Sequence, residues 1–572
     1  MTDRVPLRSA TWLEAEGKQG FIHRAWLRGL GLPDDSFRGR PIIGVANSAS
    51  ELAPCNAGLG QTAEAVKRGV WQAGGIPLEF PTMSLGETLM RPTTMMFRNL
   101  MAMEVEELLR ANPLDGVVLL SGCDKTTPAM LMAAASVDIP AIVLTAGPML
   151  AGNVAGRRVG CGTDVWRWDA DVQAGRMSAD EFRSAESGMV RSQGFCQVMG
   201  TASTMASLTE VIGMQPSGFS SLAAPDSRRL ALAHEAGRRI TAMVLEGLRP
   251  SKIVTQGSLR NAVVANAALG GSTNAVLHLL AIAGRFGLPF DLRDFDDWSR
   301  DVPLLVDVKP SGDGLMDDFD AAGGIPALLA EVADLLSLEE LTLTGRTIGE
   351  EIAGARSLNT RIIRTRTDPI AVGVGTAVLH GSLAPGGAVI KQSAASRHLL
   401  VHTGRAVVFR NMDDYVRRIN DLELPIDADS VIVVQNVGPV GYPGMPEVGN
   451  FTLPRRLLEQ GIDDVIRISD ARMSGTGFGT VVLHVAPEAA VGGPLALVRD
   501  GDQICLDVPE RRLDLLVSEA ELEVRRRDTV APLPAPRGYR RLYTSHVLQA
   551  DKGVDFDFLV GGSGDDVAGR SV

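Results

Sequence analysis

The feature that most constrains the fold of this chain is a strand, turn, helix, strand pattern between residues 116 and 144. Gly116 to Leu120 is a short apolar run that fits a buried strand, and Pro128 suits the first turn of a helix that continues to Ser136. Residues 141–144 then resume an apolar strand. A βαβ unit of this kind joins parallel strands, so the sequence predicts an N-terminal α/β domain with an open sheet.

A second strand-to-helix connection precedes this unit. Pro41 to Ala46 reads as a buried strand, and a helix is expected from about Ala57 to Ala73. Cys55 falls in the connection between them, as Cys123 falls in the turn before Pro128. Ligands of open α/β sheets gather beyond the carboxyl ends of the strands, so both cysteines are expected at a ligand site.

The character of the sequence changes near residue 370. Helical patterns dominate residues 230–336, whereas short β-like runs separated by Gly, Pro and Asp dominate after Pro369. We therefore expect two domains, 1–370 and a smaller, β-rich 371–572 that contains Glu447 and Ser474. The stretch after Arg525 has prolines at 532, 534 and 536 and is expected to end the chain as an extended surface arm.

Size and charge limit the possible partners. With 572 residues, 45% of them hydrophobic, the chain is long enough for more than one core. Its formal net charge is -12 and no long Lys/Arg run occurs, which argues against nucleic-acid and anionic-membrane partners and favours a small-molecule substrate. No signal-like N-terminus or bilayer-length apolar window is present, so a cytoplasmic protein is expected.

Five cysteines are spread widely along the chain. They are too few for a disulfide scaffold of this length, and their spacing excludes a local zinc knuckle. Cys55, Cys123 and Cys196 each lie in a turn that enters a predicted helix, which would suit an iron-sulfur cluster with one open iron position. The alternative is that these thiols are small buried hydrophobic side chains.

The segment Gly122-Cys123-Asp124-Lys125 combines a soft ligand with a hard one. Thiolates favour iron or zinc and carboxylates favour magnesium or manganese, so neighbouring metal centres are indicated. Glu87 and Glu447, both in Gly/Pro-rich loops, would complete a magnesium site with Asp124; otherwise they are solvated surface acids. Lys125 is either an exposed amine or, if buried beside a cation, an oxygen ligand after carbamylation.

Two further loops could contribute to chemistry. Ser474 lies in a glycine-spaced loop and is a candidate nucleophile or base, although a turn serine is the simpler reading and no Gly-x-Ser-x-Gly elbow surrounds it. Gly270 to Asn274 could bind an anion through backbone amides or be a tight turn.

Together these segments resemble the dihydroxy-acid and sugar-acid dehydratase family along nearly the whole chain. The motifs are Glu51-Leu52-Ala53-Pro54-Cys55-Asn56, Met83-Ser84-Leu85-Gly86-Glu87-Thr88, Gly122-Cys123-Asp124-Lys125-Thr126-Thr127-Pro128-Ala129, Met199-Gly200-Thr201-Ala202-Ser203-Thr204-Met205, Gly270-Gly271-Ser272-Thr273-Asn274-Ala275, Pro443-Gly444-Met445-Pro446-Glu447 and Arg472-Met473-Ser474-Gly475.

The resemblance implies an α/β domain, a C-terminal β-barrel-like domain and a site between them. It also implies two cofactors and a base. A 2Fe-2S cluster with one open iron would be held by Cys55, Cys123 and Cys196, and Mg²⁺ by Glu87, Asp124, carbamylated Lys125 and Glu447. Ser474, as an alkoxide, would be the base and would bind the substrate together with Thr476. Cys161 and Cys505 match no ligand motif and are expected to be structural.

Within the family, three segments look most like the pentonate dehydratases: Thr126-Thr127-Pro128, Ser474 to Gly479, and His546 to Gly553. This implies a hydro-lyase that converts aldonates such as L-arabinonate or D-xylonate to 2-keto-3-deoxy acids. It also implies a homodimer or homotetramer in which His546 reaches a neighbouring active site.

Two alternatives stay open at this point. One is the dihydroxy-acid dehydratase of branched-chain amino-acid synthesis, or an enzyme that performs both reactions. The other is a non-catalytic iron-sulfur electron carrier, which would leave Glu87, Glu447 and Ser474 without a purpose.

Overall fold

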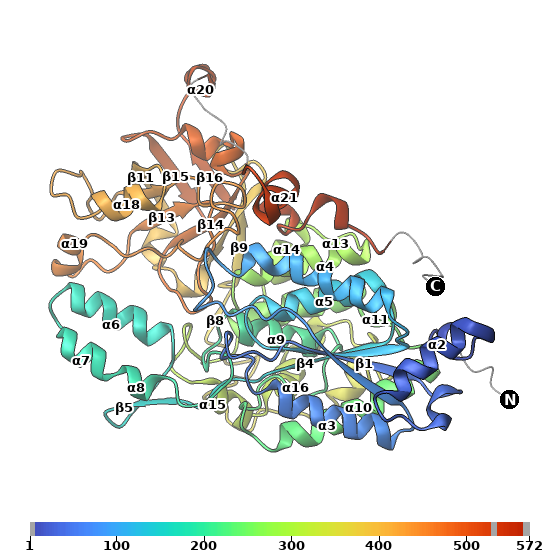
Figure 1. Ribbon diagram of the computed structural model, residues 1–572. Coiled ribbons are helices and arrows are strands. Elements are labelled where there is room, and N and C mark those ends of the chain that lie inside the picture. Colours follow the sequence, from blue (N-terminus) through green and yellow to red (C-terminus); the bar gives the residue numbers. More distant parts are fainter. Residues whose placement is uncertain (1–5, 528–534, 564–572) are drawn as a thin grey trace.

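The chain is organised by two separate sheets in a computed structural model that describes residues 6–527 and 535–563 (Figure 1). The first is a parallel four-stranded sheet in the order β2-β1-β3-β4, made of β1 (Ile42–Asn47), β2 (Ile76–Pro81), β3 (Gly116–Ser121) and β4 (Ala141–Thr145). β1 and β3 are buried along their whole length, as expected for a parallel sheet covered on both faces. The predicted α/β domain is confirmed.

Helices cover both faces of this sheet. α3 (Leu59–Gln72) and α10 (Arg228–Glu246) pack on one face, and α4 (Met95–Ala111), α5 (Thr126–Val137) and α13 (Asn274–Phe286) form a layer on the other (Figure 1). Gly69 lets α3 and α10 approach closely, since a Cβ at this position would lie only 1.9 Å from the carbonyl oxygen of His234. This packing fixes the helix that follows the Cys55 turn.

The second sheet is mixed and nearly closed. Its eight strands run in the order β16-β15-β11-β12-β13-β14-β10-β9, and a bridge between His380 and Arg512 links its two edges. The predicted barrel-like character is therefore confirmed. The strands are β9 (Thr376–Leu379), β10 (Gly387–Lys391), β11 (Val401–Phe409), β12 (Val431–Val434), β13 (Ile466–Ser469), β14 (Val481–Ala486), β15 (Gln503–Asp507) and β16 (Arg512–Leu515).

Several longer helices lie outside these layers. They are α2 (Gly17–Arg28), α6 (Thr163–Gln173), α9 (Thr201–Val211), α12 (Gln256–Leu269), α14 (Leu292–Ser299), α16 (Gly324–Glu331) and α20 (Glu519–Arg526). In the described ranges no helix combines the length and the apolarity that a bilayer-spanning segment needs.

The end of the chain differs from the extended arm that the sequence predicts. Residues 538–546 form helix α21 (Gly538–His546), and the side chains of Tyr543 and Phe556 are fully buried. Arg98 of α4 donates hydrogen bonds to the carbonyl oxygens of Gly553 and Val554, both at 2.9 Å. The tail thus packs on the N-terminal domain and ties the two domains together. Pro532 and Pro534 lie outside the described residues.

A buried ion pair anchors this tail, and its loss should destabilise the protein. Arg285 Nε lies 2.5 Å from Asp555 Oδ2, with both side chains almost inaccessible. Because Asp555→Ala leaves a buried cation with one carboxylate fewer, we expect it to lower the free energy of unfolding by about 3 kcal/mol. The exposed pair of His546 and Asp557 provides the control, since Asp557→Ala should cost less than about 1 kcal/mol. Equal midpoints of thermal unfolding for the two variants would contradict this.

Candidate functional site

Three turns of the N-terminal domain meet at one edge of the parallel sheet. Cys55 follows β1, Glu87 follows β2 and Cys123 follows β3, and these three strands are direct neighbours. The turns touch closely: a Cβ at Gly122 would lie 2.1 Å from Asn56 Oδ1, which accepts the amide of Cys123 at 2.9 Å. Glycine is therefore required at position 122 to bring the two cysteine turns together.

Lys125 is fully buried among three carboxylates. Its Nζ lies 3.0 Å from Glu87 Oε2, 3.3 Å from Asp124 Oδ2 and 2.9 Å from Glu447 Oε1. Glu447 comes from the C-terminal domain, in the loop after β12, so the cluster spans the domain interface. Burial alone would lower the pKa of Lys125, but the three carboxylates together raise it above the ordinary value of a lysine. The exposed amine that sequence alone allowed is excluded.

The carboxylates are held by further polar side chains. Thr93 donates to Glu87 Oε1 at 3.2 Å, and Thr94 donates to Glu87 Oε2. Glu447 Oε1 accepts from Asn274 Nδ2 at 2.8 Å and from Arg472 Nη1 at 2.7 Å. Although burial acts in the opposite direction, Lys125 and Arg472 lower the pKa of Glu447, which favours its charged form.

Of the three acids in the cluster, Asp124 has the most strongly shifted pKa. Burial and the neighbouring carboxylates of Glu447 and Glu87 raise its pKa to about 6, against the opposing effect of Lys125. Glu87, Asp124 and Glu447 each place one carboxylate oxygen within 4.8 Å of the other two. A group of hard oxygen ligands at this separation fits a cation such as Mg²⁺.

The thiols lie beside this carboxylate cluster. A hydrogen bond with Cys55, together with burial, raises the pKa of the Cys123 thiol, and the amide of Glu87 donates to Cys123 Sγ at 3.5 Å. Cys196 precedes α9 and forms a hydrogen bond with Cys161. This bond and burial raise the pKa of the Cys196 thiol, and the nearby Cys55 raises it further. Cys55 and Cys123 therefore lie side by side, and Cys196, which packs with Cys161, is near enough to feel the charge of Cys55. Soft sulfur atoms of this kind fit an iron-sulfur cluster, and the assignment of these three cysteines as its ligands stays a prediction.

The Ser474 loop, between β13 and β14, closes the site from the C-terminal domain. Ser474 Oγ lies 2.8 Å from Thr476 Oγ1 and accepts the amide of Thr476 at 3.3 Å. Asn274 Nδ2 donates both to Glu447 Oε1 and to the carbonyl oxygen of Met473 at 3.2 Å, so this amide links the loop to the carboxylates. Asn274 begins α13, three residues after the glycine pair Gly270-Gly271.

Two predicted residues lie elsewhere. His546 is at the end of α21, half exposed, with its ring against Asp557 and Phe558, and its contacts in the described part of the chain include neither Ser474 nor the carboxylates. Its assignment to a neighbouring subunit stays a prediction. Cys505 lies on β15, opposite Thr403 and Asp514 in the barrel-like sheet.

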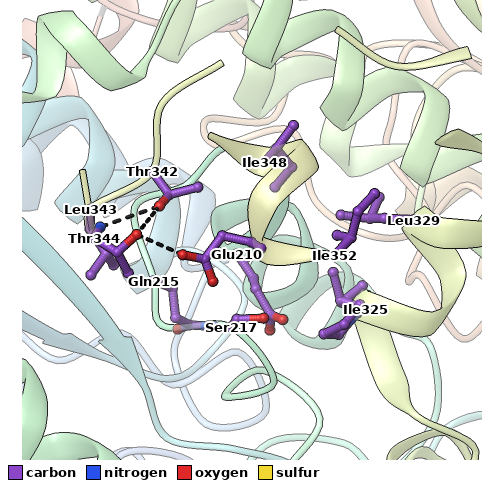
Figure 2. Close-up of a pocket in the computed structure, with 12 residues that line it drawn as sticks. Glu210, Gln215, Ser217, Ile325, Leu329, Thr342, Leu343, Thr344, Ile348 and Ile352 are labelled. Atoms are coloured by element: carbon purple, nitrogen blue, oxygen red, sulfur yellow. Dashed lines mark hydrogen bonds between the residues drawn. The ribbon is translucent and has the colours of Figure 1, made fainter. Parts of the chain in front are cut away.

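A separate hollow lies at the other end of α9. Glu210 and Thr344 are among its lining residues (Figure 2). Glu351 lines it as well, and Thr344 Oγ1 donates to Glu351 at 2.6 Å. Burial raises the pKa of Glu210 to about 7. Because α9 has eleven residues, its ends are about 15 Å apart, so this hollow is not part of the carboxylate and thiol site.

Sequence reasoning missed four residues of the site. Arg472 and Asn274 lie within motifs that were noted, but nothing in those motifs indicates that both side chains bind Glu447. Cys161 was expected to be structural, yet its thiol lies against Cys196. Trp166 gave no signal at all, although its indole reaches Thr476 from 310 residues away in the sequence.

Comparisons with known proteins agree with this arrangement. The dihydroxy-acid/6-phosphogluconate dehydratase N-terminal family model matches residues 40–351, and the corresponding C-terminal model matches residues 361–554. The chain is 52% identical to the L-arabonate dehydratase of Azospirillum brasilense, over 99% of both chains. It is also 52% identical to the L-arabinonate dehydratase of Rhizobium leguminosarum bv. trifolii, over 98% of this chain and 97% of the relative. Identity to the dihydroxy-acid dehydratase of Ignicoccus hospitalis is 43%, over 93% and 97%.

Proposed function

The chain belongs to the dihydroxy-acid/6-phosphogluconate dehydratase family and is therefore a hydro-lyase, and we propose that its substrate is a C5 aldonic acid such as L-arabinonate. The observation that supports this most is that Asn274 links the loop of Ser474, through the carbonyl oxygen of Met473, to Glu447 of the carboxylate cluster. A non-catalytic electron carrier would need neither Ser474 nor the carboxylate cluster.

Two cofactors fit the residues of the site. Glu87, Asp124, Glu447 and a carbamylated Lys125 would hold Mg²⁺, and Cys55, Cys123 and Cys196 would hold a 2Fe-2S cluster. When bound, the cation would stabilise negative charge on the oxygens of the substrate, and the open iron would act as a Lewis acid on the hydroxyl group that leaves.

The chain's own residues would then perform the proton transfer. Ser474 Oγ takes the proton from C2, the C2 electrons form a double bond to C3, and the C3 hydroxyl group leaves with its bonding pair. The resulting enol tautomerises to a 2-keto-3-deoxy acid, and the net loss is one water. Arg472 and Asn274 hold Glu447 in place through hydrogen bonds of 2.7 and 2.8 Å. A buried, preorganised arrangement of this kind favours the charge that develops in the transition state.

The preference for a sugar acid is supported by the hydroxyl groups near the carboxylates. Thr201 Oγ1 accepts from Asn274 at 2.8 Å and lies 2.9 Å from Ser272 Oγ, and Ser474 and Thr476 add two more hydroxyls. A region this rich in hydroxyl groups can exchange hydrogen bonds with the additional hydroxyls of an aldonate, whereas the aliphatic part of a branched dihydroxy acid offers no such bonds.

Substrate preference can be measured directly on anaerobically reconstituted protein. We expect kcat/KM for L-arabinonate to exceed that for 2,3-dihydroxyisovalerate by at least about 100-fold, because a site with polar groups discriminates strongly against a substrate that lacks their partners. The assay follows 2-keto acid formation from L-arabinonate, D-xylonate and 2,3-dihydroxyisovalerate, with metal-depleted protein as the control. A higher kcat/KM for the branched acid would overturn the proposed substrate.

A further inference from the structure

Helix α6 contacts the Ser474 loop across the domain interface. It belongs to the segment with α7 (Ala179–Ser184) and α8 (Glu186–Met189) that lies away from the parallel sheet, below α19 (Arg455–Glu459) of the C-terminal domain (Figure 1). Thr163 Oγ1 donates to the carbonyl oxygen of Thr476 at 3.1 Å, and Trp166 Nε1 donates to Thr476 Oγ1 at 3.0 Å. Thr476 is therefore held from α6 at two of its atoms.

The start of α6 is itself firmly positioned. Asp164 Oδ2 accepts from Lys309 Nζ and from the amide of Gly160, both at 2.6 Å, and the Lys309 and Asp164 side chains are each only 11% exposed. Gly162 packs directly on Thr476, since a Cβ there would lie 2.3 Å from Thr476 Oγ1. These contacts leave little freedom in the position of Trp166 relative to Thr476.

The Trp166 indole determines which atom donates in the hydrogen bonds that join Trp166, Thr476 and Ser474. The Trp166 N–H can only donate, so Thr476 Oγ1 accepts from it. Among the described residues the one hydrogen-bond partner left for the Thr476 hydroxyl proton is Ser474 Oγ, at 2.8 Å. Ser474 Oγ then receives two donors, this hydroxyl and the Thr476 amide.

We infer that Trp166 is a positioning residue that orients the Thr476 hydroxyl so that it stabilises negative charge on Ser474 Oγ. This inference rests on the proposed function, in which Ser474 is the base. A serine hydroxyl is a weak base unless donors stabilise its alkoxide, and aligned hydrogen bonds strengthen one another inside a protein. The Trp166 side chain is 41% exposed, so its use here lies in the N–H group more than in core packing.

Trp166→Phe tests this by removing the N–H and keeping an aromatic ring. We expect kcat to fall about 10-fold, because the variant loses one hydrogen bond of a series that ends on the charged Ser474 Oγ. KM should change by less than about 2-fold. Trp71→Phe is the matched control: Trp71 is also 41% exposed but lies on α3, and its variant should keep the kcat of the parent protein.

A double-mutant cycle separates this role from a structural one. Thr476→Val removes the hydroxyl that relays the effect, so adding Trp166→Phe to it should change kcat by less than about 2-fold, and the two losses should not add. An unchanged kcat in Trp166→Phe, or an equal loss in both backgrounds, would overturn the inference while leaving the proposed function intact. A parent protein that forms no 2-keto acid from any aldonate would overturn both. If Trp166→Phe does not fold, the two Thr476 variants provide the test. Thr476→Ser keeps the hydroxyl and must retain more activity than Thr476→Val; otherwise the inference fails.

Discussion

Ser474→Ala is expected to lower kcat for L-arabinonate by about 1,000-fold, within the range usual for removal of a general base. The preceding residue, Met473, accepts a hydrogen bond at its carbonyl oxygen from Asn274. The same Asn274 side chain also donates to Glu447. Without Ser474 Oγ, the mechanism proposed has lost the atom that takes the C2 proton. The iron content and the thermal midpoint of the variant should match those of the parent protein, because Ser474 is not a proposed cofactor ligand.

Ser393→Ala provides the control for this change. Ser393 also forms a hydroxyl-to-hydroxyl hydrogen bond, to Ser311 at 3.2 Å, and is likewise partly buried in the C-terminal domain. Its loss should leave kcat within about 2-fold of the parent value. If Ser474→Ala kept full turnover while retaining its iron, Ser474 would not be the base and the proton transfer would have to be reassigned.

Lys125→Met is expected to destabilise the metal-free protein strongly. The substitution removes the ammonium group that lies within 3.3 Å of three carboxylates and leaves their charges to repel one another in a buried site. Breaking a buried ion pair in this way costs about 3 to 5 kcal/mol. Millimolar Mg²⁺ should recover much of the loss, because a cation bound to the same carboxylates replaces the missing charge and binds only the folded state.

The same substitution at Lys391 is a matched control. Lys391 is also buried, but its Nζ has no hydrogen-bond partner among the described residues, and burial lowers its pKa to about 7. Between this value and the ordinary pKa of lysine the unfolded chain binds more protons than the folded one, so the parent protein gains stability from this group as pH rises. Lys391→Met should therefore be neutral or stabilising at pH 7 and insensitive to Mg²⁺.

The two lysine variants can be compared by thermal unfolding with and without Mg²⁺. The predicted pattern is a lowered midpoint that Mg²⁺ restores in Lys125→Met, and no such response in Lys391→Met. A Lys125→Met protein as stable as its parent in the absence of metal, or one that ignores Mg²⁺, would show that the three carboxylates alone do not form a cation site.

The local elements of this fold could be predicted because their signals are local. The apolar run Gly116 to Leu120, the proline at 128 and the renewed run at 141–144 define β3, α5 and β4 to within a residue or two. Parallel strands place their carboxyl ends at one edge, so the meeting of the Cys55 and Cys123 turns was also foreseeable.

The rest depends on which distant segments meet, and hydrophobic patterns do not encode that. The stretch after Arg525 was expected to be a surface arm. Arg98 instead binds the backbone of Gly553, 455 residues away, and Tyr543 and Phe556 are fully buried. Trp166 and Thr476 are likewise far apart in sequence. Pattern reasoning identifies the residues that are buried or polar; it does not identify their partners in three dimensions.

The electron paramagnetic resonance spectrum of the reduced, anaerobically reconstituted protein, recorded with and without L-arabinonate, tests the central claim most directly. If the thiols and the carboxylates act on one substrate, the protein should bind ~2 iron atoms per chain and its spectrum should change when L-arabinonate is added. A spectrum that is identical with and without the aldonate, or a protein that binds no iron, would contradict the account.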